Sequence, residues 1–205
     1  MATETKQAQQ GATQASPEAQ LRLHQRGHII QQPGTIRNLP IALDEGARLD
    51  NARALNLLLA DTIQLYHMYK KHHWQVAGHT FYQLHLLFDK HAEEQEALID
   101  LIAERVQQLG DIALGMPTDV VKSTRIENPP QGAEEVPVMV DRLLEAHETI
   151  IKAARELADQ AEKNGDYRTN DMMASELLRT NEMQVWFVGE HVVATPATIA
   201  HDRDS

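Results

Sequence analysis

The chain has 205 residues, enough for one domain with a sizeable core, and its aromatic share of 4% favours helix-on-helix packing over a β-sandwich. It contains no cysteine, which excludes disulfides and thiolate metal sites within these residues. The formal net charge of -11 suits cation binding and argues against a globular surface that holds nucleic acid, although many acidic proteins have neither function.

Residues 1–45 have the composition of an extension. The segment is rich in Gln, Ala and Thr, contains prolines and lacks sustained helical periodicity, so we expect it to be largely flexible, with 36–43 as the part able to pack on the domain. Its start is polar with no apolar stretch behind it, which predicts no secretory signal. No run is long enough to span a membrane, so a cytoplasmic protein is expected.

Two long helices are predicted next. Apolar residues at helical spacing indicate a first helix over about 50–76, which Ala77-Gly78 ends. Thr80 is a candidate N-cap for a second helix that ends at Gly110. The apolar residues of this second helix recur at intervals of three and four, as in a helix that packs against others.

A crossover and two further helices complete the domain. Prolines mark 111–132 as a connecting segment with room for a short helical turn. A third helix is predicted over about 134–163, with a proline near its first turn. A fourth helix is predicted to start near Asn170 or Asp171 and to reach about residue 193.

Two helical hairpins joined by one long crossover form the connection pattern of a ferritin-like four-helix bundle. We therefore predict an all-α protein with this bundle over residues 46–193 and a polar tail over 194–205. Helix length and the crossover carry the prediction, because periodicity alone does not separate this bundle from other four-helix bundles.

Four residues of the second predicted helix are candidate metal ligands. His85 and Asp89 are four residues apart, as are Asp100 and Glu104, so the members of each pair lie one turn apart on one face. Asp89 and Asp100 are about three turns apart, which places both pairs on roughly the same face. That face borders the apolar stripe, where a carboxylate is costly unless a cation neutralises it.

The separation of the two pairs determines how they can act. Their centres are about 22 Å apart along a helix, so one metal ion cannot bind both pairs of one chain. A second copy related by a two-fold axis would bring His85 and Asp89 opposite Asp100 and Glu104 of its partner. Each of two such sites would offer nitrogen and carboxylate ligands, which suit Fe(II) and also admit zinc or manganese.

The end of the first predicted helix supplies a further imidazole, His73. It precedes His85 across a short turn, so two antiparallel helices can bring these residues together. Each of the five residues taken alone is more often a core or interfacial histidine, or a surface acid, than a ligand. Together, at this spacing, they predict a metal centre.

These residues resemble the signatures of a known family. Residues 73–78, HWQVAG, followed by His85 and Asp89, are similar to the first signature of the Dps family, the mini-ferritins named as DNA-binding proteins from starved cells. Residues 99–110, IDLIAERVQQLG, are similar to the second. The helical plan extends the resemblance to roughly 50–193.

The resemblance implies a hollow homododecamer built from two-fold dimers. It implies that His73, His85 and Asp89 of one subunit form a ferroxidase centre with Asp100 and Glu104 of its dimer mate. The family oxidises Fe(II) with hydrogen peroxide or dioxygen and mineralises Fe(III) inside the shell. This removes the reagents of hydroxyl-radical chemistry and protects against oxidative damage.

Further roles come from the resemblance alone. Trp74 is similar to a family tryptophan thought to intercept radical electrons, and its alternative is a packing aromatic. Asp166 and Asp171 resemble the acidic lining of the family's threefold iron-entry pore, with Ser175 where a further acid often occurs. The alternative is that Asp171 caps the fourth helix.

The chain has more histidine than the centre requires. By helical spacing His72 and His91 face away from the neighbouring ligands, so we expect most of the extra histidines to be surface groups, with one additional ligand left open. The extra histidines near the motifs are His67, His72, His79 and His91.

Two other functions are weighed against iron oxidation. A DNA-compacting structural protein is the first, but the N-terminal tail is nearly neutral, so we expect weak or absent DNA binding. An ordinary ferritin or other di-iron oxidase is the second. Those proteins use Glu-x-x-His pairs within one chain, and this sequence contains no such pair.

Overall fold

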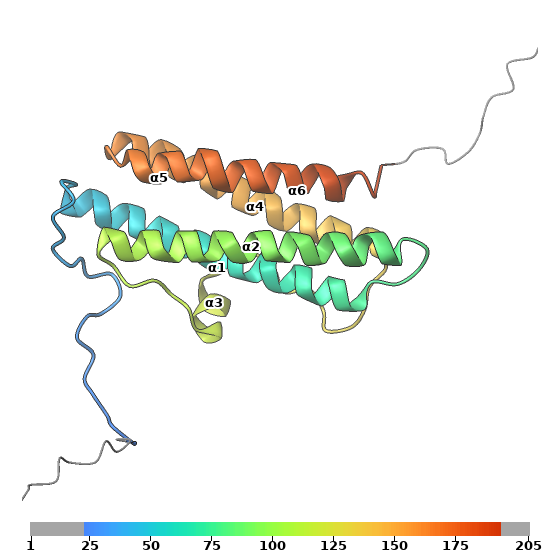
Figure 1. The fold of residues 1–205 in the computed structure, drawn as a ribbon, viewed down its shortest axis with the longest axis horizontal. Coiled ribbons are helices and arrows are strands. Elements are labelled where there is room, and N and C mark those ends of the chain that lie inside the picture. The colour runs from blue at the N-terminus through green and yellow to red at the C-terminus, as the bar shows by residue number, and fades with distance from the viewer. Residues whose placement is uncertain (1–22, 194–205) are drawn as a thin grey trace, which may run out of the picture. The chain divides into compact units, whose positions relative to one another are not determined.

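The computed structural model describes residues 23–193, and the described residues contain helices and no strand. Four long helical segments, namely α1, α2, α4 and the continuous run α5–η1–α6, lie side by side as a bundle (Figure 1). This confirms the predicted all-α fold with one long crossover. The elements are α1 (Glu45–Gln75), α2 (Phe81–Leu109), α3 (Pro117–Ser123), α4 (Val136–Lys163), α5 (Tyr167–Met172), the π-helix η1 (Met173–Leu178) and α6 (Arg179–Gly189).

The bundle belongs to a unit that begins at residue 31, whereas residues 23–30 belong to a separate unit and form no helix. The predicted tail, 194–205, and most of the predicted extension, 1–22, lie outside the described residues. None of the helices in the described part of the chain is long and apolar enough to cross a lipid bilayer.

The first helix begins at Glu45 rather than near residue 50. Asp44 is its N-cap, and the Asp44 carboxylate accepts a hydrogen bond of 2.8 Å from the Gly46 amide. The early turns carry a buried polar residue, Arg48, which donates to the Arg37 carbonyl oxygen at 2.9 Å. Hydrophobic spacing missed this start because buried polar groups stand where apolar residues were expected.

The second helix ends at Gly110, as predicted. Gly110 has a φ of 98°, a left-handed conformation that L side chains rarely adopt. A Cβ atom at this position would lie 2.6 Å from the Arg37 carbonyl oxygen. The Gly110 carbonyl accepts from Arg37 N at 2.9 Å and from Gln31 Nε2 at 2.7 Å, so residues 31–37 are bonded to this helix end.

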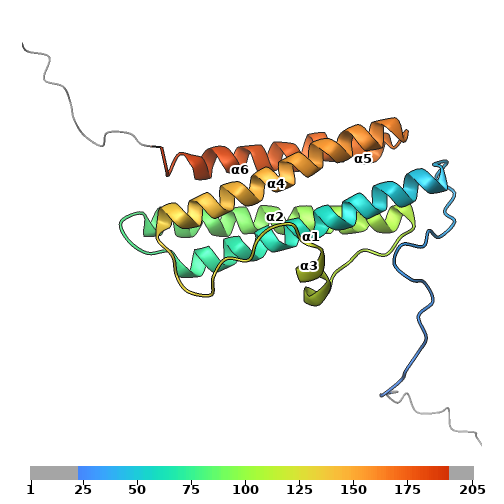
Figure 2. The same cartoon turned by 180° about the vertical axis from the view of Figure 1, so that it is seen from behind.

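The crossover between α2 and α4 contains α3 and packs on α1 (Figure 2). Asp61 of α1 is fully buried, and its carboxylate accepts from Thr124 Oγ1 at 2.9 Å and from Arg125 Nε at 2.9 Å. A buried carboxylate needs such partners. These bonds fix the crossover segment that follows α3.

The fourth helical segment begins at Tyr167, so the predicted start near Asn170 or Asp171 is wrong. Asp166 is the N-cap, and its carboxylate accepts from the Thr169 amide at 3.0 Å. Asp171 therefore does not cap this helix. The π-helix η1 interrupts the α-helical repeat, which was not predicted.

Candidate metal centre

The end of α1 and the start of α2 bring His73 and His85 together. Their rings stack with centroids 3.8 Å apart and planes 19° apart. His73 Nδ1 lies 2.7 Å from the His85 carbonyl oxygen, and His85 Nδ1 lies 2.9 Å from the His73 carbonyl oxygen. A carbonyl oxygen only accepts, so each Nδ1 carries the hydrogen and each Nε2 keeps a lone pair. Histidine ligands of metals are oriented in this way.

Asp89 lies one turn after His85 on α2, and one of its carboxylate oxygens is 3.8 Å from His73 Nε2. The ammonium of Lys70 donates to the same oxygen at 2.5 Å. The hydrogen bond from Lys70 holds the pKa of Asp89 below its usual range. Asp89 is therefore a carboxylate at neutral pH, and it is paired with the Lys70 ammonium. A metal ion that binds Asp89 would have to displace Lys70 or share the carboxylate with it.

Lys70 belongs to neither sequence motif. It lies three residues before His73, so both side chains emerge on one face of α1. The spacing in the sequence indicates this shared face, but it does not mark Lys70 as part of a metal site, because a lysine is not a metal ligand at neutral pH.

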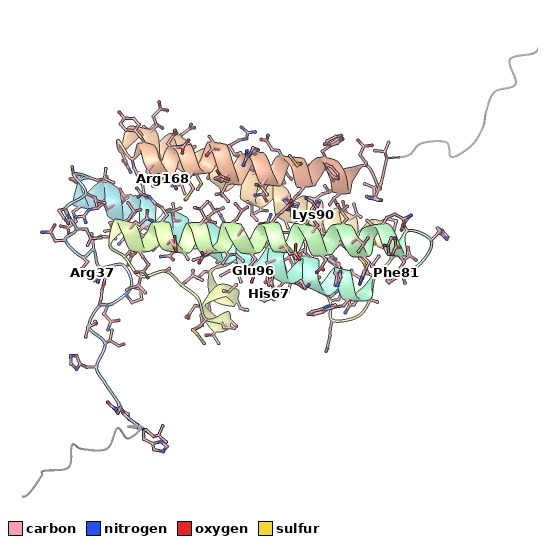
Figure 3. The ribbon with its side chains drawn as sticks, in the orientation of Figure 1. Arg37, His67, Phe81, Lys90, Glu96 and Arg168 are labelled. Carbon is pink, nitrogen blue, oxygen red and sulfur yellow. The ribbon has the colours of Figure 1, made fainter. Side chains whose placement is uncertain are left out.

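Asp100 and Glu104 lie far from this group, on exposed positions of α2. The helix runs without interruption from Phe81 to Leu109, so the separation of about 22 Å between the two pairs applies to the folded chain. In Figure 3, Phe81 marks the beginning of α2, and Arg168, in α5, lies near the opposite end of the bundle.

No group of three or more His, Asp or Glu residues within 23–193 is arranged to hold a metal ion. The structure thus brings His73, His85 and Asp89 near one another and leaves Asp100 and Glu104 apart from them. Within one chain the five predicted ligands do not meet, and Asp100 and Glu104 are exposed.

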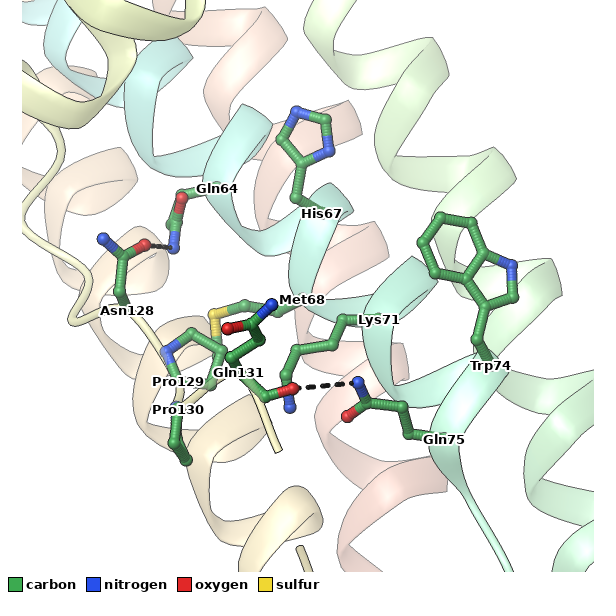
Figure 4. Close-up of a pocket in the computed structure, with 10 residues that line it drawn as sticks. All are labelled: Gln64, His67, Met68, Lys71, Trp74, Gln75, Asn128, Pro129, Pro130 and Gln131. Carbon is green, nitrogen blue, oxygen red and sulfur yellow. Dashed lines mark hydrogen bonds between the residues drawn. The ribbon is translucent and has the colours of Figure 1, made fainter. Parts of the chain in front are cut away.

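Trp74 follows His73 and is 71% exposed. It borders a pocket of about 350 Å³ between α1 and the crossover, which His67 and Met68 also line (Figure 4). Two residues of the pocket lining are hydrogen-bonded across it: Gln75 Nε2 donates to the Gln131 carbonyl oxygen at 3.2 Å. Trp74 is not a core aromatic of this chain, and it directly follows His73 in the sequence.

Asp166 does not present a carboxylate to a pore, which corrects the expectation for this residue. It is 3% exposed, and it accepts from Arg105 Nη2 at 2.6 Å, from Thr169 Oγ1 at 2.6 Å and from Asn51 Nδ2 at 2.9 Å. These bonds fix the turn that precedes α5. Asp171 is exposed, so only this member of the predicted pair faces solvent.

The extra histidines also differ from expectation. His67 and His79 are exposed, as predicted, but His72 and His91 are buried. His72 and His91 lie on faces of α1 and α2 that are turned away from His73, His85 and Asp89. These faces point into the bundle, so both histidines lie in the core. Burial lowers the pKa of His72 and of His91 to about 4, so both are neutral imidazoles at neutral pH.

Comparison with known proteins identifies the family. A family model described as the ferritin-like domain matches residues 52–197. DpsC from Streptomyces coelicolor is 52% identical, with a TM-score of 0.82 over 84% of this chain and 100% of that one. A nutrient stress-induced DNA-binding protein of Nostoc is 32% identical and covers 75% of this chain and 84% of its own. A DNA protection during starvation protein of Halobacterium salinarum is 33% identical over 63% of this chain and 71% of its own. The chain belongs to the Dps family of the ferritin-like superfamily.

Proposed function

We propose that the chain oxidises and stores iron, at centres shared between two subunits. The observation that carries this proposal is the reciprocal bonding of His73 and His85 through Nδ1, which leaves Nε2 of each neutral imidazole free, with His73 Nε2 3.8 Å from the Asp89 carboxylate. Nitrogen and carboxylate ligands together suit Fe(II).

In this proposal each centre takes His73, His85 and Asp89 from one subunit and Asp100 and Glu104 from its two-fold mate. The two histidines bind Fe(II) through Nε2, and the carboxylates bind it and offset its charge. Two Fe(II) ions reduce one hydrogen peroxide to two waters with uptake of two protons, or dioxygen serves as oxidant. Iron is the substrate and cargo of this chemistry.

We assign Trp74 an accessory role as an electron donor near the centre, because it directly follows His73 in the sequence and its ring is exposed. The oxidised iron would be stored inside a shell of twelve subunits, and its removal from solution would protect against oxidative damage. A cytoplasmic location stays a prediction from the sequence. We do not propose a pore role for Asp166, whereas Asp171 remains a candidate.

An anaerobic Fe(II) titration, followed by separate additions of peroxide and dioxygen, tests the proposal. We expect saturable Fe(II) binding and rapid oxidation in the wild-type protein, and at least tenfold slower oxidation in His85→Ala. Glu96→Ala, an exposed acid on the same helix outside the ligand set, serves as the control (Figure 3). Equal oxidation rates in all three proteins would contradict an Fe(II) site at His85.

DNA compaction is the alternative function, because two of the relatives carry DNA-binding or DNA-protection names. A net charge of -11 per chain repels phosphates, so we expect no strong binding at physiological salt. A gel-shift assay of metal-free protein with plasmid DNA checks this. Tight retardation that resists salt would favour the alternative.

A further inference from the structure

The middle of the bundle contains a cluster of polar side chains that the proposed iron site does not use. Each is at most 1% exposed, and they come from α1, α2, α4 and α6. Polar groups inside a bundle are costly unless they are bonded to one another. The cluster consists of Tyr69, His91, Gln95, His147, Asn181 and Gln184.

The π-helix η1 lies next to this cluster. It ends at Leu178, and Asn181 Nδ2 donates to the carbonyl oxygen of Leu177, within η1, at 2.8 Å. π-Helical turns are rare and frequently mark functional sites. Asn181 is thereby held with its Oδ1 toward the cluster.

These bonds fix the direction of every hydrogen bond around Tyr69. Because Asn181 Nδ2 is committed to Leu177, Oδ1 accepts from His147 Nδ1 at 2.9 Å. His147 Nε2 therefore keeps a lone pair, and the Tyr69 hydroxyl, 2.6 Å away, donates to it. His91 Nδ1, 3.2 Å from the same hydroxyl oxygen, then donates to Tyr69.

The protonation states match this arrangement. Burial raises the pKa of Tyr69 well above its usual range, so Tyr69 is a protonated phenol. Burial lowers the pKa of His147 to about 3, so His147 is a neutral imidazole at neutral pH. Loss of an electron turns the phenol into a strong acid, so its proton can pass to Nε2 of His147, 2.6 Å away, even though burial disfavours the protonated imidazole.

Tyr69 also lies close to the iron half-site. It is one turn before His73 on α1, about 6 Å along the helix axis. Its ring contacts Phe88, with centroids 5.9 Å apart, and Phe88 directly precedes Asp89. The phenol is thus on the core side of the residues that would bind Fe(II), shielded from water.

We propose that Tyr69 is a redox-active residue that gives one electron to the oxidant at the iron centre while its proton passes to Nε2 of His147. This inference rests on the proposed function, which supplies iron and peroxide. When a centre holds a single Fe(II), that ion provides one of the two electrons that peroxide requires, and Tyr69 provides the second. Fe(II), H2O2, the phenol, His147 and two protons give Fe(III), two waters, a neutral tyrosyl radical and protonated His147.

Electron paramagnetic resonance of samples frozen within milliseconds of mixing tests this inference. The protein is loaded with less than one Fe(II) per centre and mixed with peroxide, and Fe(II) oxidation is followed in parallel by stopped-flow absorbance. We expect a tyrosyl signal whose hyperfine structure collapses with ring-deuterated tyrosine. Tyr69→Phe should reduce this signal at least tenfold, whereas Tyr66→Phe, on the same helix, should change neither the signal nor the iron oxidation.

Two further variants separate a redox role from a structural one. His147→Gln keeps a hydrogen-bond acceptor but no base, so the radical yield should fall at least fivefold. The triple variant Tyr66→Phe, Tyr82→Phe, Tyr167→Phe leaves Tyr69 as the only one of the four tyrosines and changes no fully buried side chain. Its signal should persist, which keeps the test valid if Tyr69→Phe does not fold.

The outcomes distinguish the inference from the proposed function. An unchanged signal in Tyr69→Phe, or its loss in the triple variant, overturns the inference and leaves iron oxidation standing. If the wild-type protein does not oxidise Fe(II), the proposed function fails. A photochemically generated one-electron oxidant then tests Tyr69 directly in the triple variant, where absence of a tyrosyl signal overturns the redox assignment.

Discussion

The chemistry of several histidines in this bundle depends on which ring nitrogen carries the hydrogen. His73 and His85 each give Nδ1–H to the backbone of the other, so Nε2 of each ring takes no part in these bonds. His147 gives Nδ1–H to Asn181 and so becomes the acceptor for Tyr69. In our proposals the first arrangement serves metal binding and the second serves proton transfer.

The burial of His147 predicts a pH dependence of stability. Its folded pKa of about 3 lies below the ordinary value of 6.5, so the unfolded chain binds a proton first as pH falls. Between pH 7 and pH 5 this group should lower the free energy of unfolding by about 2 kcal/mol. Chemical denaturation of wild type and His147→Gln at both pH values measures this change.

His147→Gln should be the less stable protein at pH 7, because it disturbs the bonds to Tyr69 and Asn181. It lacks the titrating imidazole, so the stability gap between the two proteins should narrow at pH 5. A gap that stays constant or widens would show that His147 is not buried as a neutral group.

At the scale of elements, helix ends are fixed by a few caps and close contacts. Gly110 ends α2 and binds residues 31–37 through its carbonyl group. Gly110→Ala forces a left-handed alanine, which costs about 1–2 kcal/mol, and places its Cβ 2.6 Å from the Arg37 oxygen. We expect a loss of at least about 2 kcal/mol in the free energy of unfolding.

Thermal denaturation measures this loss as a lower melting temperature of Gly110→Ala. In a separate limited-proteolysis experiment, cleavage within residues 31–43 should be faster in this variant. Gly115→Ala is the control, because a Cβ there meets nothing within 4 Å. Equal melting temperatures for the two variants would mean that the contact between Gly110 and Arg37 contributes nothing to stability.

The sequence predicts those helices whose ends and apolar faces are marked by residues close together in the chain. α2 was predicted from Thr80 to Gly110 because a glycine stop and a regular apolar series are visible in the chain. The start of α1 was missed because Asp44 and the buried Arg48 interrupt the apolar pattern. The π-helix η1 packs against α4, and the hydrophobic periodicity of the sequence does not predict it.

The same limit applies to the candidate site. The spacing of His73, His85 and Asp89 was enough to predict that they meet, because one short turn joins their helices. The burial of Asp166 was not predictable, because its partner Arg105 is 61 residues away in the chain. Spacing along one helix predicts on which face of the helix a residue lies. It does not predict which other segments of the chain pack against that face.

At the scale of the whole molecule, an incomplete ligand set in one chain predicts an assembly. The half-sites that we propose at opposite ends of α2 would need a two-fold mate to form a centre, and family membership predicts a closed shell of twelve. Light scattering or sedimentation near neutral pH should find a particle of roughly 280 kDa, which is twelve chains of 23.1 kDa. A stable monomer that oxidises Fe(II) rapidly would contradict a shared centre.

The shared centre also predicts that two inactive variants restore each other. His85→Ala and Glu104→Ala damage opposite halves of one centre, so each should lose rapid Fe(II) oxidation on its own. In a mixed dimer, one centre lacks both ligands and the other has every ligand intact. With random pairing at equal amounts about half the dimers are mixed, so about a quarter of wild-type activity should return.

The matched control mixes His85→Ala with Asp89→Ala, which damage the same half, so no dimer contains an intact centre. The most direct measurement of the central claim is therefore the Fe(II) oxidation rate of both mixtures after subunit exchange, verified by mass spectrometry. We predict about a quarter of wild-type activity for His85→Ala with Glu104→Ala, and none above the single variants for the control. Verified exchange with no recovery in the first mixture would contradict a ferroxidase centre shared between subunits.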